Sequence, residues 1–102
     1  MYLVELLLPI YDNAGGRFPK EAFDRVRAEL TERYGGVTAF LRAPAIGLWR
    51  DDDGVVRRDE VVSFEVMTDT LDEAWWGDYR RSLATRFAQD DVVVRALEAR
   101  RL

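Results

Sequence analysis

The sequence predicts a single α+β domain in which strands and helices follow one another in the order βαββαβ. Three observations predict it. The chain has 102 residues, the length of one domain, so residues 1–102 are expected to fold as a single unit. Its composition is 48% hydrophobic, which is typical of a globular chain rather than a disordered one. Short apolar runs, typical of strands, flank two longer stretches with helical periodicity.

The first half of the chain predicts a strand, a helix and a second strand. Residues 2–11 form an apolar run that is too short for a buried helix. A helix is expected over residues 19–34, because Pro19 suits a first turn and apolar side chains recur at spacings of three and four. Two glycines follow in the position where helices favour glycine. Residues 37–43 then form the second strand.

The second half repeats this plan. Residues 61–67 and 92–98 predict the third and fourth strands, and a helix begins after Thr70. Apolar side chains repeat every four residues along that helix: Leu71, Trp75, Tyr79, Leu83 and Phe87. Two interleaved right-handed βαβ units give the ferredoxin-like arrangement, an antiparallel sheet of order 4-1-3-2 with both helices on one face.

Residues 47–60, GLWRDDDGVVRRDE, connect two adjacent antiparallel strands and therefore predict a hairpin. Asp and Gly at its tip suit a tight turn. A calcium loop alternates its acidic ligands, whereas Asp51, Asp52 and Asp53 are consecutive and no Glu closes the cage. We interpret the run as a solvated tip, and an arm that extends beyond the sheet is one form it can take. A partner contact stays open for four residues: Trp49, Arg50, Arg57 and Arg58.

The helices cover one face of the sheet, so the other face must meet water, a ligand or another chain. Alternation along the strands places seven apolar side chains on that outward face: Leu3, Leu7, Phe40, Val61, Met67, Val93 and Leu97. Four charged side chains are expected in a row across it: Arg95, Glu5, Glu65 and Arg42. So many apolar side chains are unusual on a solvated surface, and we expect the face to be covered.

Two compatible interpretations of this face remain. In the first, two copies pack sheet to sheet as a homodimer and the four charges pair across the seam. In the second, the face also encloses a pocket in which Glu5 and Glu65 act on a small-molecule ligand. Adjacent like charges favour proton uptake by one of them, which is the property of a general base.

These interpretations yield a set of candidate residues. The candidate catalytic residues are Glu5 and Glu65. The candidate ligand-binding residues are Arg42, Arg95, Phe40, Ser63, Arg17 and Trp76. Arg17 follows a glycine-containing loop before a helix N-terminus, which is either an anion site or a plain connection. Trp76 lies at the edge of its helix's apolar stripe. It is expected to lie at the margin of the core, to contact a second subunit or to form part of a pocket wall.

Composition excludes several functional classes. The chain contains no Cys and no His, so it has no thiol nucleophile, disulfide, zinc cluster or Ser-His-Asp triad. We expect no metal and no cofactor. A net charge of −4 disfavours nucleic acid as a partner. The N-terminal run lacks the basic segment of a signal peptide, and no run is long enough to span a membrane, which favours the cytoplasm.

Four segments, LVELLLP, PKEAFDRVRAELTERYGG, VSFEV and VVVRALE, resemble the dimeric α+β-barrel proteins of the ferredoxin-like superfamily. The resemblance covers nearly the whole chain and implies a homodimer with a cleft between sheet and helices. The group includes cofactor-independent monooxygenases, haem-handling proteins, small isomerases and short bacterial families without an assigned role. It carries no catalytic residue over, and the histidine-dependent branches do not fit a chain without His.

The expected function is that of a non-enzymatic ligand-binding or accessory protein. The alternative is a cofactor-independent isomerase or monooxygenase acting on a small anionic or aromatic metabolite. In that alternative, Glu5 or Glu65 is the base, and Arg42 or Arg95 holds the substrate.

Overall fold

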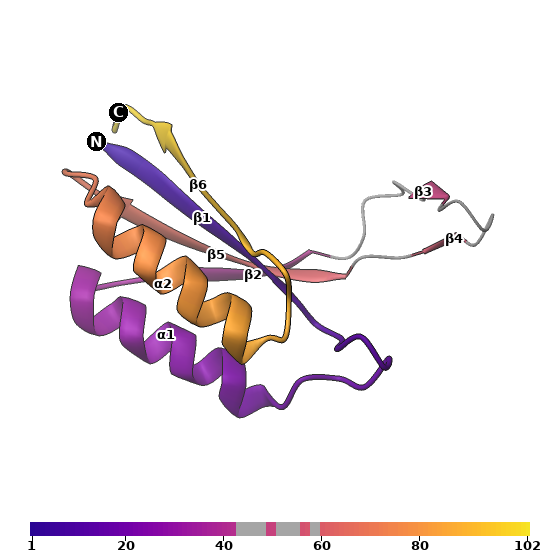
Figure 1. The fold of residues 1–102 in the computed structure, drawn as a ribbon. Helices are drawn as coiled ribbons and strands as arrows, with labels where there is room; N and C mark the ends of the chain where they lie inside the picture. The colour runs from indigo at the N-terminus through magenta and orange to yellow at the C-terminus, as the bar shows by residue number, and fades with distance from the viewer. Residues whose placement is uncertain (43–48, 51–55, 58–59) are drawn as a thin grey trace.

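The computed structural model describes residues 1–42, 49–50, 56–57 and 60–102. The elements are β1 (Tyr2–Pro9), α1 (Lys20–Tyr34), β2 (Thr38–Arg42), β3 (Trp49–Arg50), β4 (Val56–Arg57), β5 (Val61–Thr68), α2 (Glu73–Arg86) and β6 (Val93–Glu98). Four strands form an antiparallel sheet in the spatial order β2-β5-β1-β6. Both helices lie on one face of this sheet (Figure 1). The predicted ferredoxin-like α+β fold and its strand order are therefore confirmed.

Both helices begin and end where local chemistry allows. Pro19 occupies the N-cap of α1 with extended backbone, so it precedes the helix rather than opening it. Gly35 ends α1 at a φ of 78°, and its N–H donates to the Thr31 carbonyl over 2.7 Å. A left-handed residue of this kind is commonly glycine, because a side chain there clashes with the backbone. Asp72 caps α2 by accepting a hydrogen bond from the Trp75 N–H over 3.1 Å.

The hydrophobic core lies between the sheet and the two helices. Alternate residues of the central strands supply one side of it: Val4, Leu6, Leu8, Phe64 and Val66. The helices and the α2–β6 segment supply the other: Val26, Leu30, Trp76, Tyr79, Leu83, Phe87 and Val92. The predicted division of the central strands into inward and outward side chains agrees with this packing, because a strand alternates its side chains between two faces.

The two adjacent tryptophans differ from the prediction, which placed Trp75 in the apolar stripe of the helix and Trp76 at its edge. Trp76 is 5% exposed and belongs to the core, whereas Trp75 is only partly buried against it. Seven residues make nearly two helical turns, so Trp76 lies only about 20° around the axis from Leu83, whereas Trp75 lies about 80° away. A repeat of four residues drifts around the helix, and this drift carries Trp75 to the edge facing α1.

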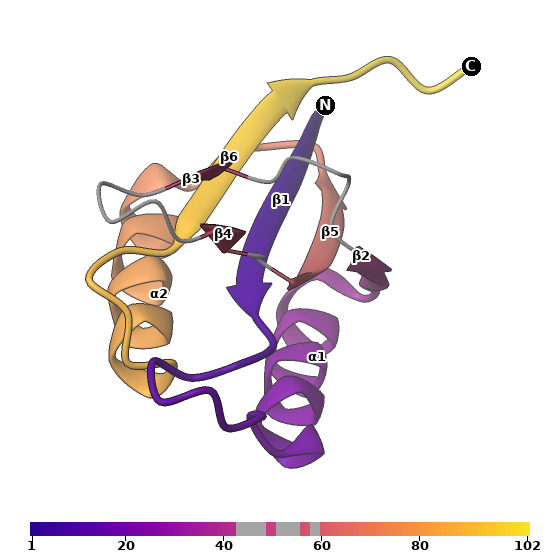
Figure 2. The same cartoon turned by 90° about the vertical axis from the view of Figure 1, so that its right-hand side faces the viewer.

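β3 and β4 form a separate antiparallel ladder with Trp49 opposite Arg57. This ladder lies beyond the ends of the main strands, and Figure 2 shows it in front of the sheet when the molecule is viewed from that end. The run of three aspartates and Arg58 lie outside the described residues, as do the side chains of β3 and β4. Neither described helix is both long and apolar enough to cross a bilayer.

Candidate functional site

An ion pair between the buried carboxylate of Glu5 and the half-exposed side chain of Arg95 lies at the centre of the outward sheet face. Glu5 is only 8% exposed, and the Arg95 Nε donates a hydrogen bond to its Oε2 over 2.7 Å. The two residues are directly opposite in the ladder between β1 and β6. A buried carboxylate is costly unless it is paired, so Arg95 allows Glu5 to occupy this otherwise apolar region.

Glu65 lies directly opposite Glu5 on the other side of β1. The Ile10 N–H donates to the Glu60 carbonyl, and these residues continue the same register. Hydrogen-bonded pairs alternate along an antiparallel ladder, so Glu5 and Glu65 form a non-hydrogen-bonded pair, in which side chains are closest. The expected juxtaposition of the two carboxylates is therefore present in the fold.

Arg42 does not complete the expected charged row. Thr38 is the residue of β2 opposite Glu65, and Arg42 lies opposite Val61 near the end of the sheet. Alternation identifies which face a residue occupies, but the pairing of two strands sets its position along that face. The row observed across the sheet is Arg95, Glu5, Glu65 and Thr38. The side chain of Arg42 is outside the described part of the structure.

Ser63 occupies the next outward row, between Leu7 and Phe40. It is fully buried, and its hydroxyl has no hydrogen-bond partner among the residues that the structure describes. Phe40, in contrast, is 45% exposed. An unsatisfied buried hydroxyl costs about 1–3 kcal/mol, so Ser63 is an energetic liability in an otherwise apolar row.

Apolar side chains on the outward face are strongly exposed around this polar centre. Val93 and Leu97 of the edge strand β6 are 49% and 48% exposed, and Met67 of β5 is 46% exposed. Together with Phe40 they form a discontinuous apolar border around the ion pair. This arrangement is typical of a surface that contacts another molecule rather than water alone.

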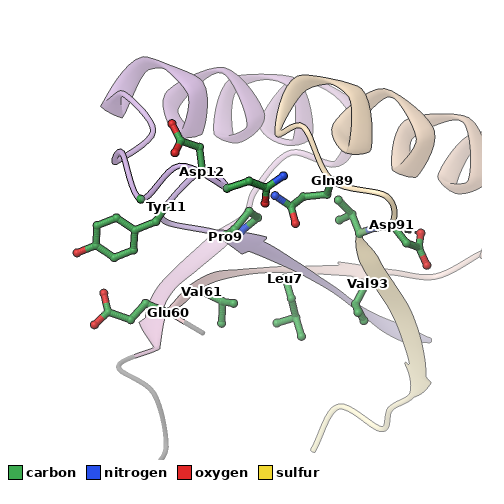
Figure 3. Close-up of a pocket in the computed structure, with 12 residues that line it drawn as sticks. Leu7, Pro9, Tyr11, Asp12, Glu60, Val61, Gln89, Asp91 and Val93 are labelled. Atoms are coloured by element: carbon green, nitrogen blue, oxygen red, sulfur yellow. Dashed lines mark hydrogen bonds between the residues drawn. The ribbon is translucent and has the colours of Figure 1, made fainter. Parts of the chain in front are cut away.

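An open depression of about 820 Å³ lies at one end of this face. Its apolar wall includes Leu7, Val61 and Val93, whose side chains point to the same side of the sheet in Figure 3. Leu7 and Val93 are two residues along their strands from Glu5 and Arg95. The depression is therefore a continuation of the outward face, formed where the β1–α1 and α2–β6 loops meet the sheet.

The polar wall of the depression is acidic. Asp12, Glu60 and Asp91 line it, and none of the described lining residues is cationic. Asp91 accepts a hydrogen bond from the Arg80 Nη1 over 2.5 Å. Glu60 has no ion pair among the described residues. Sequence reasoning missed these three residues because they lie in loops and at a strand end, and only the fold brings them together.

In the loop before α1, the carboxylate of Asp12 accepts the hydrogen bonds of the loop's own backbone N–H groups. Asp12 Oδ1 accepts hydrogen bonds from the N–H groups of Ala14 and Gly16 over 2.9 and 2.8 Å. Those donors are the ones that an anion at this loop would need. Arg17 is exposed and pairs through its backbone with Tyr11, at the border of the depression.

Trp76 borders a second, smaller cavity of about 220 Å³ between α2 and β6. Its ring stacks on Tyr34, with centroids 5.3 Å apart, and its buried indole N–H has no acceptor in the described ranges. Gly77 also borders this cavity. Trp76 is thus part of the core and the wall of a cavity that lies on the opposite side of the sheet from Ser63.

A polar clamp joins the two helices away from the outward face. Arg86 donates two hydrogen bonds to the carboxylate of Glu29, and the Tyr79 hydroxyl donates a third over 3.2 Å. The hydrogen bonds from Arg86 lower the pKa of Glu29 below its usual value. Burial and the neighbouring Glu29 charge raise the pKa of Tyr79. We assign this clamp to helix packing, since its three residues join the two helices and line neither the depression nor the small cavity beside α2.

Within the described ranges, no group of three or more acidic side chains is arranged to hold a metal ion.

Neither a family model nor a curated protein sequence matches the chain. The chain is similar in structure to a phage SAM lyase in complex with S-methyl-5′-thioadenosine, with a TM-score of 0.58 and 14% sequence identity. The match covers 95% of this chain and 80% of the lyase chain. At this identity the likeness supports the fold alone.

Proposed function

We propose that this protein is a homodimeric, non-enzymatic accessory protein that packs through its outward sheet face and binds a small molecule in the adjoining depression. The observation that carries the proposal is the apolar border around the ion pair of buried Glu5 and half-exposed Arg95. This is the assembly implied by the resemblance to the dimeric α+β-barrel proteins.

The charge arrangement supports contact between two copies. Glu5 is already neutralised by Arg95 within one chain, so covering this pair does not leave either charge unpaired. Breaking a buried pair is far more costly than enclosing an intact one. The half-exposed side chains of Phe40 and Met67 then lose their contact with water, which stabilises the assembly by about 25 cal/mol per Å² of apolar area.

The depression supports a ligand that is neutral or cationic. Its apolar wall suits an apolar or aromatic body, and Glu60 and Asp12 suit a positive group. This proposal therefore has a neutral or cationic ligand in place of the anionic metabolite that was expected from Arg42 and Arg95. Arg95 already binds Glu5, and the depression adds no basic side chain among its described lining residues.

The solution mass tests the dimer. Phe40→Glu places a charge on the proposed seam, and we expect it to halve the mass measured by sedimentation, because an unpaired charge in the seam is costly. Ala28→Glu, on the exposed side of α1, is the matched control and should keep the wild-type mass. A monomeric wild type, or a Phe40→Glu variant with unchanged mass, would refute packing through this face.

A second candidate is an enzyme that acts on a nucleoside sulfonium compound. The structural neighbour is a SAM lyase in complex with a thioadenosine, and the acidic wall of the depression suits a sulfonium cation. In this candidate the carboxylates near the cation are Glu60 and Asp12 in the depression, with Glu5 as the candidate base in the adjoining row.

One assay separates the two candidates. The purified chain is incubated with S-adenosylmethionine, and release of S-methyl-5′-thioadenosine is followed by chromatography, with a thermal shift measured in parallel. A ligand-binding protein shows a rise in melting temperature without release. An enzyme shows release that Glu5→Gln abolishes while the fold is kept, and an active Glu5→Gln variant removes Glu5 as the base. If S-methyl-5′-thioadenosine is not released and the melting temperature does not change, both candidates are contradicted for this compound class.

A further inference from the structure

The outer side of β6 is a free sheet edge. Among the described residues, β6 pairs only with β1. The Ala99 N–H donates to the Met1 carbonyl over 3.0 Å, in the same register as the rest of this ladder. Because hydrogen-bonded pairs alternate, the backbone groups of Val93, Arg95 and Leu97 face β1. Those of Val94, Ala96 and Glu98 face away from the sheet.

This edge lacks most of the devices that usually protect one, although it carries two charged side chains, Arg95 and Glu98. Proteins commonly blunt a free edge with proline, lysine, a bulge or a very short strand. β6 has six residues, none of which is proline or lysine, and five of the six are exposed. A free edge of this kind is suited to receive another strand.

The charges that flank β6 are of opposite sign. Asp90 and Asp91 precede the strand, whereas Arg100 and Arg101 follow it, and all four are exposed. In an antiparallel pair of identical strands, the beginning of one strand lies beside the end of the other. The acidic beginning of β6 is therefore complementary to the basic end of a second β6.

We propose that β6 pairs with β6 of a second copy of this chain about a two-fold axis, so that the two sheets join edge to edge. Arg95 lies opposite the partner's Arg95 in this register, and its charge is compensated by Glu5 of its own chain. Val93 lies opposite the partner's Leu97, which covers two half-exposed side chains. Arg100 lies opposite the partner's Asp90.

The small cavity beside α2 supports the same register. Val94 and Ala96 both border it, and their backbone groups face the free edge. The register places the partner's Val94 opposite Ala96, next to this cavity. Cross-strand apolar pairs of this kind contribute roughly 0.2–1 kcal/mol each, in addition to the new backbone hydrogen bonds.

This edge contact shares Val93 and Leu97 with the apolar border of the face contact proposed above, but it forms through the backbone of β6 and uses neither Phe40 nor Met67. The sheet edge and the sheet face point in different directions, so the two contacts can operate together. Where the two two-fold axes allow the assembly to close, a chain with both contacts forms a tetramer, whereas a chain with the edge contact alone forms a dimer.

A proline substitution tests the edge. Ala96→Pro removes an N–H that faces away from β1, and we expect the solution mass to be halved. Ala96→Val keeps that N–H and is the matched control, with wild-type mass expected. Far-UV circular dichroism checks that both variants are folded. A folded Ala96→Pro variant with the wild-type mass overturns the proposal.

A charge exchange tests the register without altering the strand. Arg100→Asp and Asp90→Arg alone should each weaken the association by about tenfold, because the two-fold axis sets two pairs of like charges against each other. Combining the two substitutions should restore the wild-type affinity. Failure of the double variant to recover, when both single variants are weakened, refutes the antiparallel register.

The two contacts give separable results. If Phe40→Glu halves the mass and Ala96→Pro does not, the face contact stands and the edge contact is refuted. If Ala96→Pro halves the mass and Phe40→Glu does not, the edge contact stands and the face contact is refuted. A monomeric wild type at high micromolar concentration refutes both.

Discussion

Single residues in this protein differ in how their burial is compensated. Glu5 is buried and paired with Arg95, and Glu29 is half-buried and held by Arg86 and Tyr79. Ser63 is fully buried, and within the described part of the chain its hydroxyl has no hydrogen-bond partner. The first two cases satisfy the rule that buried charges need partners. Ser63 departs from the related rule that a buried polar group needs a hydrogen-bond partner. It lies on the face where we propose that another molecule binds.

The Glu29 clamp makes stability depend on pH in acid. Its pKa is lowered in the folded state from the usual 4.5, so its contribution is present above that value and is lost as the pH falls through the folded-state pKa. We expect wild type to lose more unfolding free energy than Glu29→Gln between pH 6 and pH 3, measured by urea unfolding. Glu32→Gln, on the exposed side of α1, serves as the control. Equal losses in wild type and Glu29→Gln would contradict the clamp.

Among the secondary-structure elements, the two helices use glycine in different ways. Gly35 ends α1 in the left-handed region, where glycine is favoured. Gly77 lies inside α2, where glycine destabilises a helix. A Cβ at Gly77 would meet only the Arg81 side chain, at 3.6 Å, so packing does not require glycine there. Because Gly77 has no side chain, it helps to leave the small cavity beside β6 open.

These two glycines form a matched pair of substitutions. We expect Gly77→Ala to raise the unfolding free energy by about 0.5–1 kcal/mol, the usual difference between alanine and glycine in a helix. Gly35→Ala should lower it by about 1 kcal/mol or more, because alanine is strained at a positive φ. Urea unfolding measures both. A destabilised Gly77→Ala variant would show that the α2–β6 cavity cannot accept even a methyl group.

At the scale of the whole molecule, one layer of helices covers one face of the sheet, and no helix in the described part of the chain packs on the other face (Figure 2). The inward residues Phe64 and Leu83 are fully buried, whereas Phe40 and Val93 on the outward side are about half exposed. Small domains are stable by only about 5–15 kcal/mol. Covering this second face and the free edge of β6 therefore changes a large fraction of the total stability, and we expect assembly and folding to be coupled.

The candidate site shows which parts of a site are predictable from sequence. Alternation along β1 and β5 placed Glu5 and Glu65 on one face, and the connectivity made their strands neighbours, so their juxtaposition followed. Arg42 was misplaced in the row because the register of β2 against β5 is set by pairing at Thr38. Glu60 and Asp91 were missed because they are distant in sequence and meet only where two loops converge.

Apolar periodicity and the positions of glycine and proline determined by themselves the α+β class, the strand order and the covered and uncovered faces of the sheet. These properties depend on short-range patterns that each element carries in its own residues. Only the tertiary structure decided the burial of Glu5 and its hydrogen bond from Arg95 within one chain, the depression and the burial of Trp76. Each of these depends on register, helix rotation or loop convergence, which are set by packing between segments far apart in the chain.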